Sequence, residues 1–240
     1  MNQIYYKDLG IIPYKEAWDF QEKLMNEKVS KKLNPDNTET IQNHLLLCRH
    51  PHVYTLGMHG NQENLLLNSA SLKEKGIEFY KTNRGGDITY HGPGQLVAYP
   101  ILDLEQFGGS IKVYLRSLEE VVIKTIAEFG IASGRIEGIT GVWIEPETVR
   151  ARKICALGVR CNHWISLHGL ALNINTDLSY FRNIVPCGLT DKGVSSMKEE
   201  LGTEVGEAKL TEIFLGKFGE VFGSEIRKAE EQFEKVSHTV

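Results

Sequence analysis

The stretch from Arg84 to Tyr99 constrains the fold more than any other part of the sequence. It reads RGGDITYHGPGQLVAY and holds four of the chain's 23 glycines. Polar, apolar and turn residues alternate too closely in it for a plain helix or strand. The flanking runs, 76–82 and 96–102, are rich in β-forming and apolar residues. We therefore expect a strand, a turn, a short strand, a second turn and a final strand.

Glycines mark both expected turns. Gly85-Gly86 suits a tight hairpin turn, because glycine reaches positive φ without a Cβ clash, and Gly92-Pro93-Gly94 suits a second turn. Hairpin chemistry alone would explain the glycines. It does not explain the number of polar side chains, and the third glycine of a dinucleotide fingerprint and the Gly-Lys-Ser/Thr of a P-loop are both absent. Those polar residues are Arg84, Asp87, Thr89, His91 and Gln95.

The stretch resembles the signature of the lipoyl(octanoyl) transferases, enzymes of lipoate biosynthesis that move an octanoyl group from acyl carrier protein to a lysine. The resemblance extends from about His50 to about Lys198. Ten specified positions of the signature are matched without a departure: Arg84, Gly85, Gly86, Thr89, Tyr90, His91, Gly94, Gln95, Val97 and Tyr99.

Length and composition narrow the class of protein. The 240 residues fit one catalytic domain, 1–240, and a hydrophobic content of 41% is ordinary for a globular chain. A net charge of −4 argues against general nucleic-acid binding, which needs a basic field. The N-terminus lacks a signal-peptide pattern, and no apolar run reaches the length of a membrane span. We expect a cytoplasmic protein with reduced thiols.

The periodicity predicts an α+β chain, with helices packed on a largely antiparallel or mixed sheet. The resemblance implies the biotin/lipoate protein ligase-like fold, which is related to class II aminoacyl-tRNA synthetases. The charged segment 224–240 is expected to be a frayed tail. The expected helices are 13–33, 69–75, 110–129 (capped by Ser110, with Val113, Leu118, Val121, Val122, Thr125 and Ile126 toward the core) and 207–222, and the later expected strands are 44–56, 141–145, 153–164 and 166–175, with a bend near His163.

Four cysteines are candidate nucleophiles. Cys48, Cys155 and Cys161 lie in strand patterns, where a thiol more often fills space than reacts. Cys187 differs, since Pro186 and Gly188 hold it in a turn that can present a thiol. The resemblance implies that Cys187 is the nucleophile and forms an acyl thioester. It also implies that Lys153, at the head of a Lys-Ile-x-x-Leu-Gly strand, lowers the pKa of that thiol and moves protons.

The implied reaction is ping-pong transfer that needs no ATP, metal or other cofactor. Octanoyl-acyl carrier protein is the donor. The acceptors are lysines on lipoyl domains of 2-oxoacid dehydrogenase complexes and on the glycine cleavage H protein. Backbone N–H groups around Gly158 or Cys187-Gly188 are expected to stabilise the oxyanion. The basic residues Arg150 and Arg152 are expected to face the acidic carrier, unless they are simply solvated.

The resemblance also implies a substrate pocket for the acyl chain. His91 is read as part of this pocket rather than as a base, and His50 and His52 as turn residues rather than metal ligands. The small residues among the pocket set could instead serve close packing of strand on helix. The pocket set is Arg84, Gly85, Gly86, Asp87, Ile88, Thr89, Tyr90, His91, Ala156, Leu157, Gly158, Gly169, Leu170 and Ala171.

Three other functions fit parts of the pattern. An ATP-dependent lipoate- or biotin-protein ligase would share the fold but would need an adenylate site and no nucleophilic cysteine. A cysteine hydrolase would pair Cys187 with His91 or His168 and release free octanoate. A non-catalytic acyl-binding protein would form no adduct at Cys187.

Overall fold

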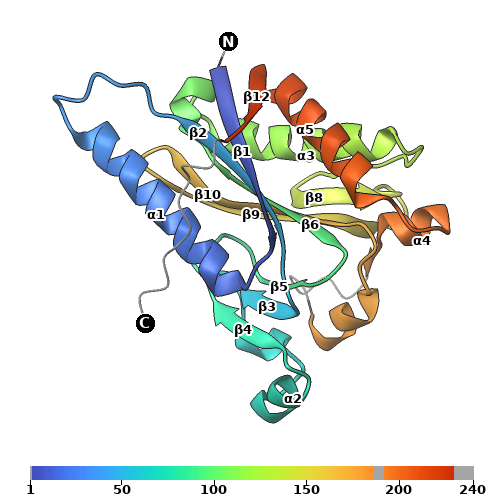
Figure 1. Ribbon diagram of the computed structural model, residues 1–240. Helices are drawn as coiled ribbons and strands as arrows, with labels where there is room; N and C mark the ends of the chain where they lie inside the picture. Colours follow the sequence, from blue (N-terminus) through green and yellow to red (C-terminus); the bar gives the residue numbers. More distant parts are fainter. Residues whose placement is uncertain (1, 186–191, 230–240) are drawn as a thin grey trace.

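The computed structural model describes residues 2–185 and 192–229, which form one large mixed sheet, one small sheet and the helices that cover them (Figure 1). The strands are β1 (Asn2–Ile11), β2 (Asn43–Arg49), β3 (Val53–Leu56), β4 (Glu78–Lys81), β5 (Ile88–His91), β6 (Gln95–Ile101), β7 (Gly134–Ile136), β8 (Ile139–Ile144), β9 (Arg152–Asn162), β10 (Ile165–Asn173), β11 (Gly193–Val194) and β12 (Ser224–Lys228). The α-helices are α1 (Tyr14–Leu33), α2 (Ser69–Glu74), α3 (Ile111–Ala127), α4 (Met197–Leu201) and α5 (Glu207–Phe222), and the short 3-10 helices are η1 (Gln62–Asn64), η2 (Leu104–Phe107) and η3 (Leu178–Asn183).

Within the described residues the large sheet has the strand order β12-β1-β2-β6-β10-β9-β8-β7, with β11 also paired to β9. The pairs β12–β1, β1–β2 and β11–β9 are parallel, and the other neighbours are antiparallel. Strands β9 and β10 form a long hairpin whose turn contains His163, as expected. The sequence prediction of an α+β chain with a mixed sheet is confirmed.

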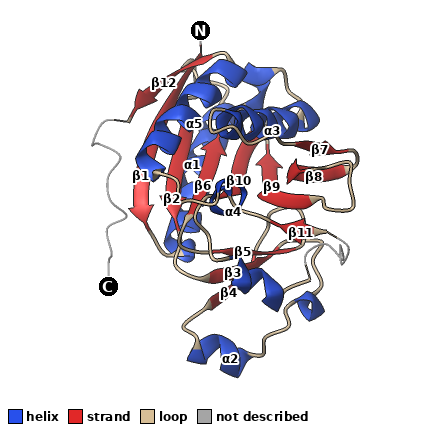
Figure 2. Cartoon of the chain, turned by 90° about the vertical axis from the view of Figure 1, so that its right-hand side faces the viewer, coloured by secondary structure: helices blue, strands red, loops and turns tan. Residues whose placement is uncertain are grey.

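Helices cover both faces of this sheet, with α1 on one face and α3 and α5 on the other (Figures 1 and 2). The central strand β2 shows why. Its side chains alternate, so Leu45 and Leu47 join the core under α3 and α5, whereas Leu46 and Cys48 join the core under α1. A strand buried on both faces reads as a continuous apolar run, which is what 45–48 is.

The small sheet has the order β4-β3-β5 and its own apolar cluster, which includes Tyr54, Tyr90 and Ile184. It lies against one end of the large sheet, next to α2 and η3 (Figure 2). The segment predicted as one strand from 44 to 56 is therefore two strands, β2 and β3, in different sheets. The corner between them is His50-Pro51-His52, and the proline there is a signal for this break.

The hairpin expected at Gly85-Gly86 is wrong. Strands β4 and β5 do not pair with each other, because β3 lies between them, parallel to β4 and antiparallel to β5. Gly86 does take a positive φ of 84°, but its carbonyl accepts a hydrogen bond from His59 N rather than closing a hairpin. The loop instead folds onto residues 57–59, and a Cβ on Gly57 would lie 2.3 Å from Gly86 O.

Both ends of the described chain differ from expectation. Strand β1 was not predicted, because 2–11 alternates poorly and only Ile4 in it is fully buried. Residues Ser224–Lys228, expected to belong to a frayed tail, form β12 and pair with β1. Residues 230–240 of that expected tail lie outside the described residues.

The helix predictions are largely confirmed. Helix α5 spans the predicted residues, and Ser110 caps α3 by accepting a hydrogen bond from Val113 N at 3.3 Å. Val113, expected in the core, is instead exposed. It lies in the first turn of α3, where the apolar stripe has not yet met the sheet. Among the described helices, none is both long and apolar enough to cross a bilayer.

Candidate active site

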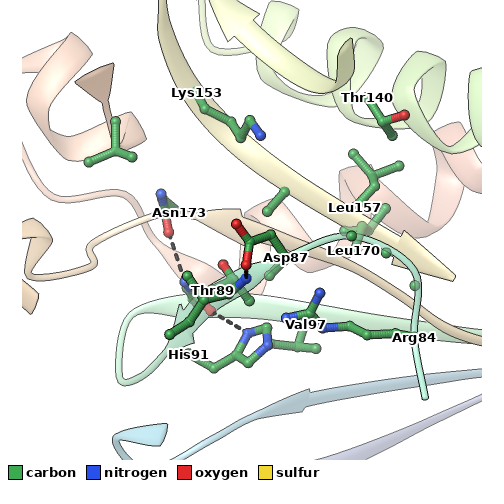
Figure 3. A pocket seen from close by; sticks show the side chains of 18 of the residues that line it. Arg84, Asp87, Thr89, His91, Val97, Thr140, Lys153, Leu157, Leu170 and Asn173 are labelled. Atoms are coloured by element: carbon green, nitrogen blue, oxygen red, sulfur yellow. Dashed lines mark hydrogen bonds between the residues drawn. The ribbon is translucent and has the colours of Figure 1, made fainter. Parts of the chain in front are cut away.

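A cavity of ≈ 410 Å³ lies where the small sheet and the loop before β5 meet strands β6, β10 and β9 of the large sheet (Figure 3). The large sheet supplies small and apolar walls, and the loop supplies polar ones. Figure 3 shows Lys153 on β9 across this space from Thr89 and His91 on β5. The arrangement brings together segments between residues 84 and 171 that sequence reasoning treated as one site.

The cavity is lined by nearly all of the described residues predicted for the site. The exceptions are Gly85, whose N–H donates to Val159 O at 3.0 Å, and Tyr90, which turns away into the small-sheet cluster and stacks on Tyr180. Cys187 lies outside the described residues, as does the Pro186-Cys187-Gly188 loop. The predicted residues that line the cavity are Lys153, Arg84, Gly86, Asp87, Ile88, Thr89, His91, Ala156, Leu157, Gly158, Gly169, Leu170 and Ala171.

Two of the lining glycines are required by the packing of backbone on backbone. A Cβ on Gly158 would lie 2.9 Å from Gly85 O, and one on Gly169 would lie 2.1 Å from Ala98 O. Gly158 and Gly169 are also cross-strand partners in the β9–β10 hairpin. Close packing therefore explains these glycines by itself, and the same closeness leaves bare backbone at the cavity wall.

A β-bulge in β9 separates Lys153 from Cys155, two residues that regular strand alternation would place on one face. Val142 pairs with Cys155, and the next residue, Trp143, pairs with Lys153. Ile154 and Cys155 consequently both lie in the core under α3 and α5, while Lys153 lines the cavity. A bulge that re-aims one side chain beside a site is a recurrent device in sheets.

Arg84 is 7% exposed and binds the protein's own groups at the cavity wall. Its Nη2 donates to Thr55 O at 2.6 Å and to Thr55 Oγ1 at 2.9 Å, and its Nη1 donates to Gly85 O at 3.0 Å. These bonds fix the guanidinium and the Thr55 hydroxyl. That hydroxyl lies 3.5 Å from His91 Nε2, to which its proton can be directed.

A chain of hydrogen bonds crosses the floor of the site from β5 to the segment after β11. Gln95 Nε2 donates to Tyr90 O at 3.1 Å and to Asn173 Oδ1 at 2.9 Å, so its Oε1 faces His91 Nδ1 at 3.2 Å. His91 therefore carries its proton on Nδ1. Asn173 Nδ2 in turn donates to Ser195 O at 3.0 Å, which ties β10 to the segment after β11.

Both histidines considered as bases are held in the neutral form. Burial, then the nearby His50 and Arg84, lower the pKa of His91 well below its usual value. Burial and the Arg84 charge lower the pKa of His168 to about 3. His168 also has a strained positive φ of 61°, and its Nε2 donates to Asn83 Oδ1 at 2.6 Å. Imidazoles with such low pKa values are weak proton acceptors.

The two arginines expected to face a carrier are paired with carboxylates instead. Arg150 Nη2 lies 2.6 Å from Glu145 Oε1, and Arg152 pairs with Glu145 and with Glu200 at 2.5 Å each. Glu200 also accepts a hydrogen bond from Ser195 Oγ. Arg152 therefore braces the β9–β11 end of the site, and the expectation that these arginines face an acidic carrier stays a prediction.

The described cysteines make poor nucleophiles. Cys48 and Cys155 are fully buried, and burial strongly raises the pKa of each thiol. Burial also raises the pKa of the half-buried Cys161. Their thiols are protonated at neutral pH, as the sequence interpretation of space-filling cysteines predicts.

No group of three or more His, Cys, Asp or Glu suited to a metal occurs in the part of the chain that the structure describes. Both ring nitrogens of His50 lie within hydrogen-bond distance of protein groups: Nδ1 is 2.8 Å from Ile12 O, and Nε2 is 2.8 Å from the Tyr99 hydroxyl. His52 stacks on Tyr180 at a centroid distance of 4.3 Å. Both act at the corner between the sheets.

Sequence reasoning missed several lining residues. Gln95, Val97 and Tyr99 were motif positions, so the match itself was the available signal. Trp143 and Asn173 are brought in by pairing of distant strands, which a single sequence does not reveal. The missed lining residues are Tyr14, Gln95, Val97, Tyr99, Gly138, Ile139, Thr140, Trp143, His168, Asn173, Phe181, Lys192, Gly193 and Val194.

Comparison with known proteins gives consistent matches. The family model of the lipoyl protein ligase A/B catalytic domain matches residues 13–219. A protein of Flavobacterium johnsoniae named octanoyltransferase is 56% identical over 205 residues, which are 84% of this chain and 88% of that protein. A protein of Cytophaga hutchinsonii with the same name is 52% identical over 205 residues, which are 83% of this chain and 84% of that protein.

A solved structure agrees with the fold. The bipartite lipoate protein ligase of Thermoplasma acidophilum superposes with a TM-score of 0.68 at 15% identity, covering 95% of this chain and 87% of that one. This likeness confirms the lipoate-ligase-like fold that the sequence resemblance implied.

Proposed function

This chain belongs to the lipoyl protein ligase A/B catalytic-domain family, and we propose that it transfers octanoyl groups from acyl carrier protein to lysines of lipoyl domains through an acyl thioester on Cys187. As a relative of octanoyltransferases at 52–56% identity, it is an acyltransferase of protein lipoylation. The acceptors in this proposal are 2-oxoacid dehydrogenase lipoyl domains and the glycine cleavage H protein, and the location is the cytoplasm.

The observation that carries the proposal is the position of Lys153. Its side chain lines a cavity whose sheet wall includes the small residues Ala156, Gly158, Gly169 and Ala171. A narrow wall of small residues suits an unbranched acyl chain that lies along the strands. An ammonium at one end of such a slot favours a thiolate over a thiol, and it can supply or take a proton at the reacting carbonyl.

In the first half-reaction the Cys187 thiolate attacks the octanoyl thioester carbonyl of the carrier. The tetrahedral intermediate collapses, the carrier's thiol leaves with a proton from Lys153, and octanoyl stays on Cys187. In the second half-reaction the acceptor lysine amine attacks that thioester. An amide forms, the amine proton passes to Lys153, and Cys187 leaves as thiolate. Both carbonyl groups enter as thioesters, so no activation by ATP is needed.

Two observations disfavour the alternatives. A hydrolase dyad needs an effective base, and burial lowers the pKa of both His91 and His168 far below neutrality. An ATP-dependent ligase shares the fold, but the ligase compared here is 15% identical, against 52% and 56% for the two octanoyltransferases. These observations favour transfer from a thioester donor.

The test is transfer without nucleotide. The purified chain is mixed with octanoyl-acyl carrier protein and a lipoyl domain, and the mass of the lipoyl domain is followed. We expect it to gain one octanoyl group at its acceptor lysine with ATP absent. Octanoylation only from free octanoate plus ATP would identify a ligase, and release of octanoate with no change in the lipoyl domain would identify a hydrolase.

A further inference from the structure

Trp143 stands beside Lys153 in a way that its contribution to the core does not explain. The two residues are cross-strand partners on β8 and β9, and Lys153 Nζ lies 4.7 Å from the centroid of the indole ring. Trp143 is 1% exposed and lines the cavity. A lysine ammonium within about 6 Å of a tryptophan face is attracted by the negative face of the ring.

The indole N–H gives no other reason for a tryptophan at this position. Within the described residues Trp143 Nε1 is buried and has no hydrogen-bond partner. A buried tryptophan ordinarily uses this N–H to satisfy a bond, and leaving it bare has a cost. The ring is therefore retained for its face and its volume, and the face is where the Lys153 ammonium lies.

Gly141 makes room for this pairing from the other side. Its φ is 138°, a conformation that favours glycine, and a Cβ there would lie 3.1 Å from Lys153 Cε and 3.3 Å from Trp143 Nε1. The side chain of Lys153 is thus confined between the position of that absent Cβ and the indole ring. The bulge in β9 directs Lys153 into this slot.

We propose that Trp143 is the positioning residue for Lys153: its indole face holds the ammonium charged and fixed at the cavity, so that Lys153 can stabilise the reactive thiolate. The inference rests on the proposed function, in which Cys187 is that thiol. An ammonium taken into an apolar slot loses hydration and tends to lose its proton. Attraction to the ring face offsets part of that loss.

The test measures thiol reactivity rather than transfer. The rate of Cys187 alkylation is followed by peptide mass against pH in the full chain, in Trp143→Leu and in Trp143→Phe. For Trp143→Leu we expect alkylation at pH 7 to fall about three- to tenfold, with the midpoint of the profile moved to higher pH. Trp143→Phe keeps a weaker face and loses no hydrogen bond, so its profile should lie between the other two.

A double-mutant cycle separates positioning from packing. In a Lys153→Met background, Trp143→Leu should leave the alkylation profile unchanged, because there is no ammonium left to hold. The matched control is Trp18→Leu on α1, where Lys15 lies over the ring at 5.9 Å but neither residue lines the cavity. That substitution should not move the profile.

Gly141→Ala provides a second route if Trp143→Leu does not fold, since it keeps the indole ring and its Cβ would crowd Lys153 Cε at 3.1 Å. It should move the profile in the same direction. An equal shift from Trp143→Leu with and without Lys153, or no shift in any of these variants, would overturn the inference. An unaltered profile in Lys153→Met alone would overturn it together with the role of Lys153, whereas octanoyl transfer would still be judged by its own assay.

Discussion

The two walls of the cavity use polar residues in opposite ways. In the loop wall, which includes Arg84, His91 and Gln95, Arg84 is hydrogen-bonded to Thr55 and His91 to Gln95. Burial holds His91 in its neutral form. In the strand wall, Lys153 stands among small residues and meets an aromatic face. The loop wall is thus architecture that shapes the slot, and the strand wall carries the group suited to proton transfer. A dense cluster of polar residues in a motif need not be where the chemistry occurs.

The largest expected effect is on the nucleophile that the strand wall serves. Cys187→Ala should abolish octanoyl transfer while leaving the fold intact. Cys155→Ala, two residues from Lys153 on β9, should retain most activity, because the Cys155 thiol lies in the core and its pKa is strongly raised by burial. It should lower the free energy of unfolding by about 1 kcal/mol. If Cys155→Ala lost as much transfer as Cys187→Ala, the assignment of Cys187 as the nucleophile would be contradicted.

The next effect concerns Lys153 itself. Lys153→Met should reduce turnover by about 10²-fold or more, the usual contribution of a positioned acid–base group. Lys153→Arg should recover little, because arginine keeps the charge and does not give up its proton. The measurement is turnover at saturating carrier from pH 6 to 9. Full activity in Lys153→Arg would leave only an electrostatic role for this side chain.

The buried histidines His91 and His168 should instead be revealed by the stability of the fold. Burial lowers the folded-state pKa of His91 well below 6.5 and that of His168 to about 3. Below pH 6.5 the unfolded chain binds protons that these folded histidines do not. The free energy of unfolding should then decrease as the pH is lowered, by up to about 1.4 kcal/mol per pH unit for each histidine. Urea unfolding at pH 7.5 and 5.5 measures this.

The control for that prediction is His91→Gln. This variant should be less stable at pH 7.5, because it disturbs the bond to Gln95. Its free energy of unfolding should decrease less on acidification, by the contribution of one histidine. An identical acid slope in the variant would mean that His91 titrates normally in the fold.

The smallest effect is expected at the arginines outside the cavity. The side chain of Arg150 is 74% exposed and pairs with Glu145, so Arg150→Ala should change transfer by less than about twofold. Arg152→Ala should reduce transfer by more than Arg150→Ala does, because Arg152 braces Glu200. Its loss should be the same with octanoyl-acyl carrier protein and with a small octanoyl thioester. A loss confined to the protein carrier would support the docking role expected from the sequence.

Much of the fold was predictable because local signals agreed with the tertiary structure. In three places the local sequence alone predicts the element that forms: the Ser110 cap, the amphipathic run 207–222 and the apolar run 45–48. The prediction of a hairpin at Gly85-Gly86 was wrong although Gly86 does take a positive φ, because β4 and β5 pair with β3 and not with each other. Strand β3, some 30 residues earlier, inserts between β4 and β5, and no local pattern encodes that choice.

The candidate site divides in the same way. Residues within one contiguous motif, such as Arg84 and His91, were found from the sequence. Trp143 was missed because its role depends on a register with a bulge, which places it opposite Lys153. Tyr90 was assigned to the pocket from the motif, but strand alternation turns it into the small-sheet core while His91 lines the cavity.

The most direct test of the central claim is the intact mass of this chain after mixing with octanoyl-acyl carrier protein and no acceptor. We predict a gain of one octanoyl group, located on Cys187 by peptide mapping, and its loss when a lipoyl domain is then added. An adduct that is absent under conditions where the lipoyl domain becomes octanoylated, or one that maps to Cys48, Cys155 or Cys161, would contradict it.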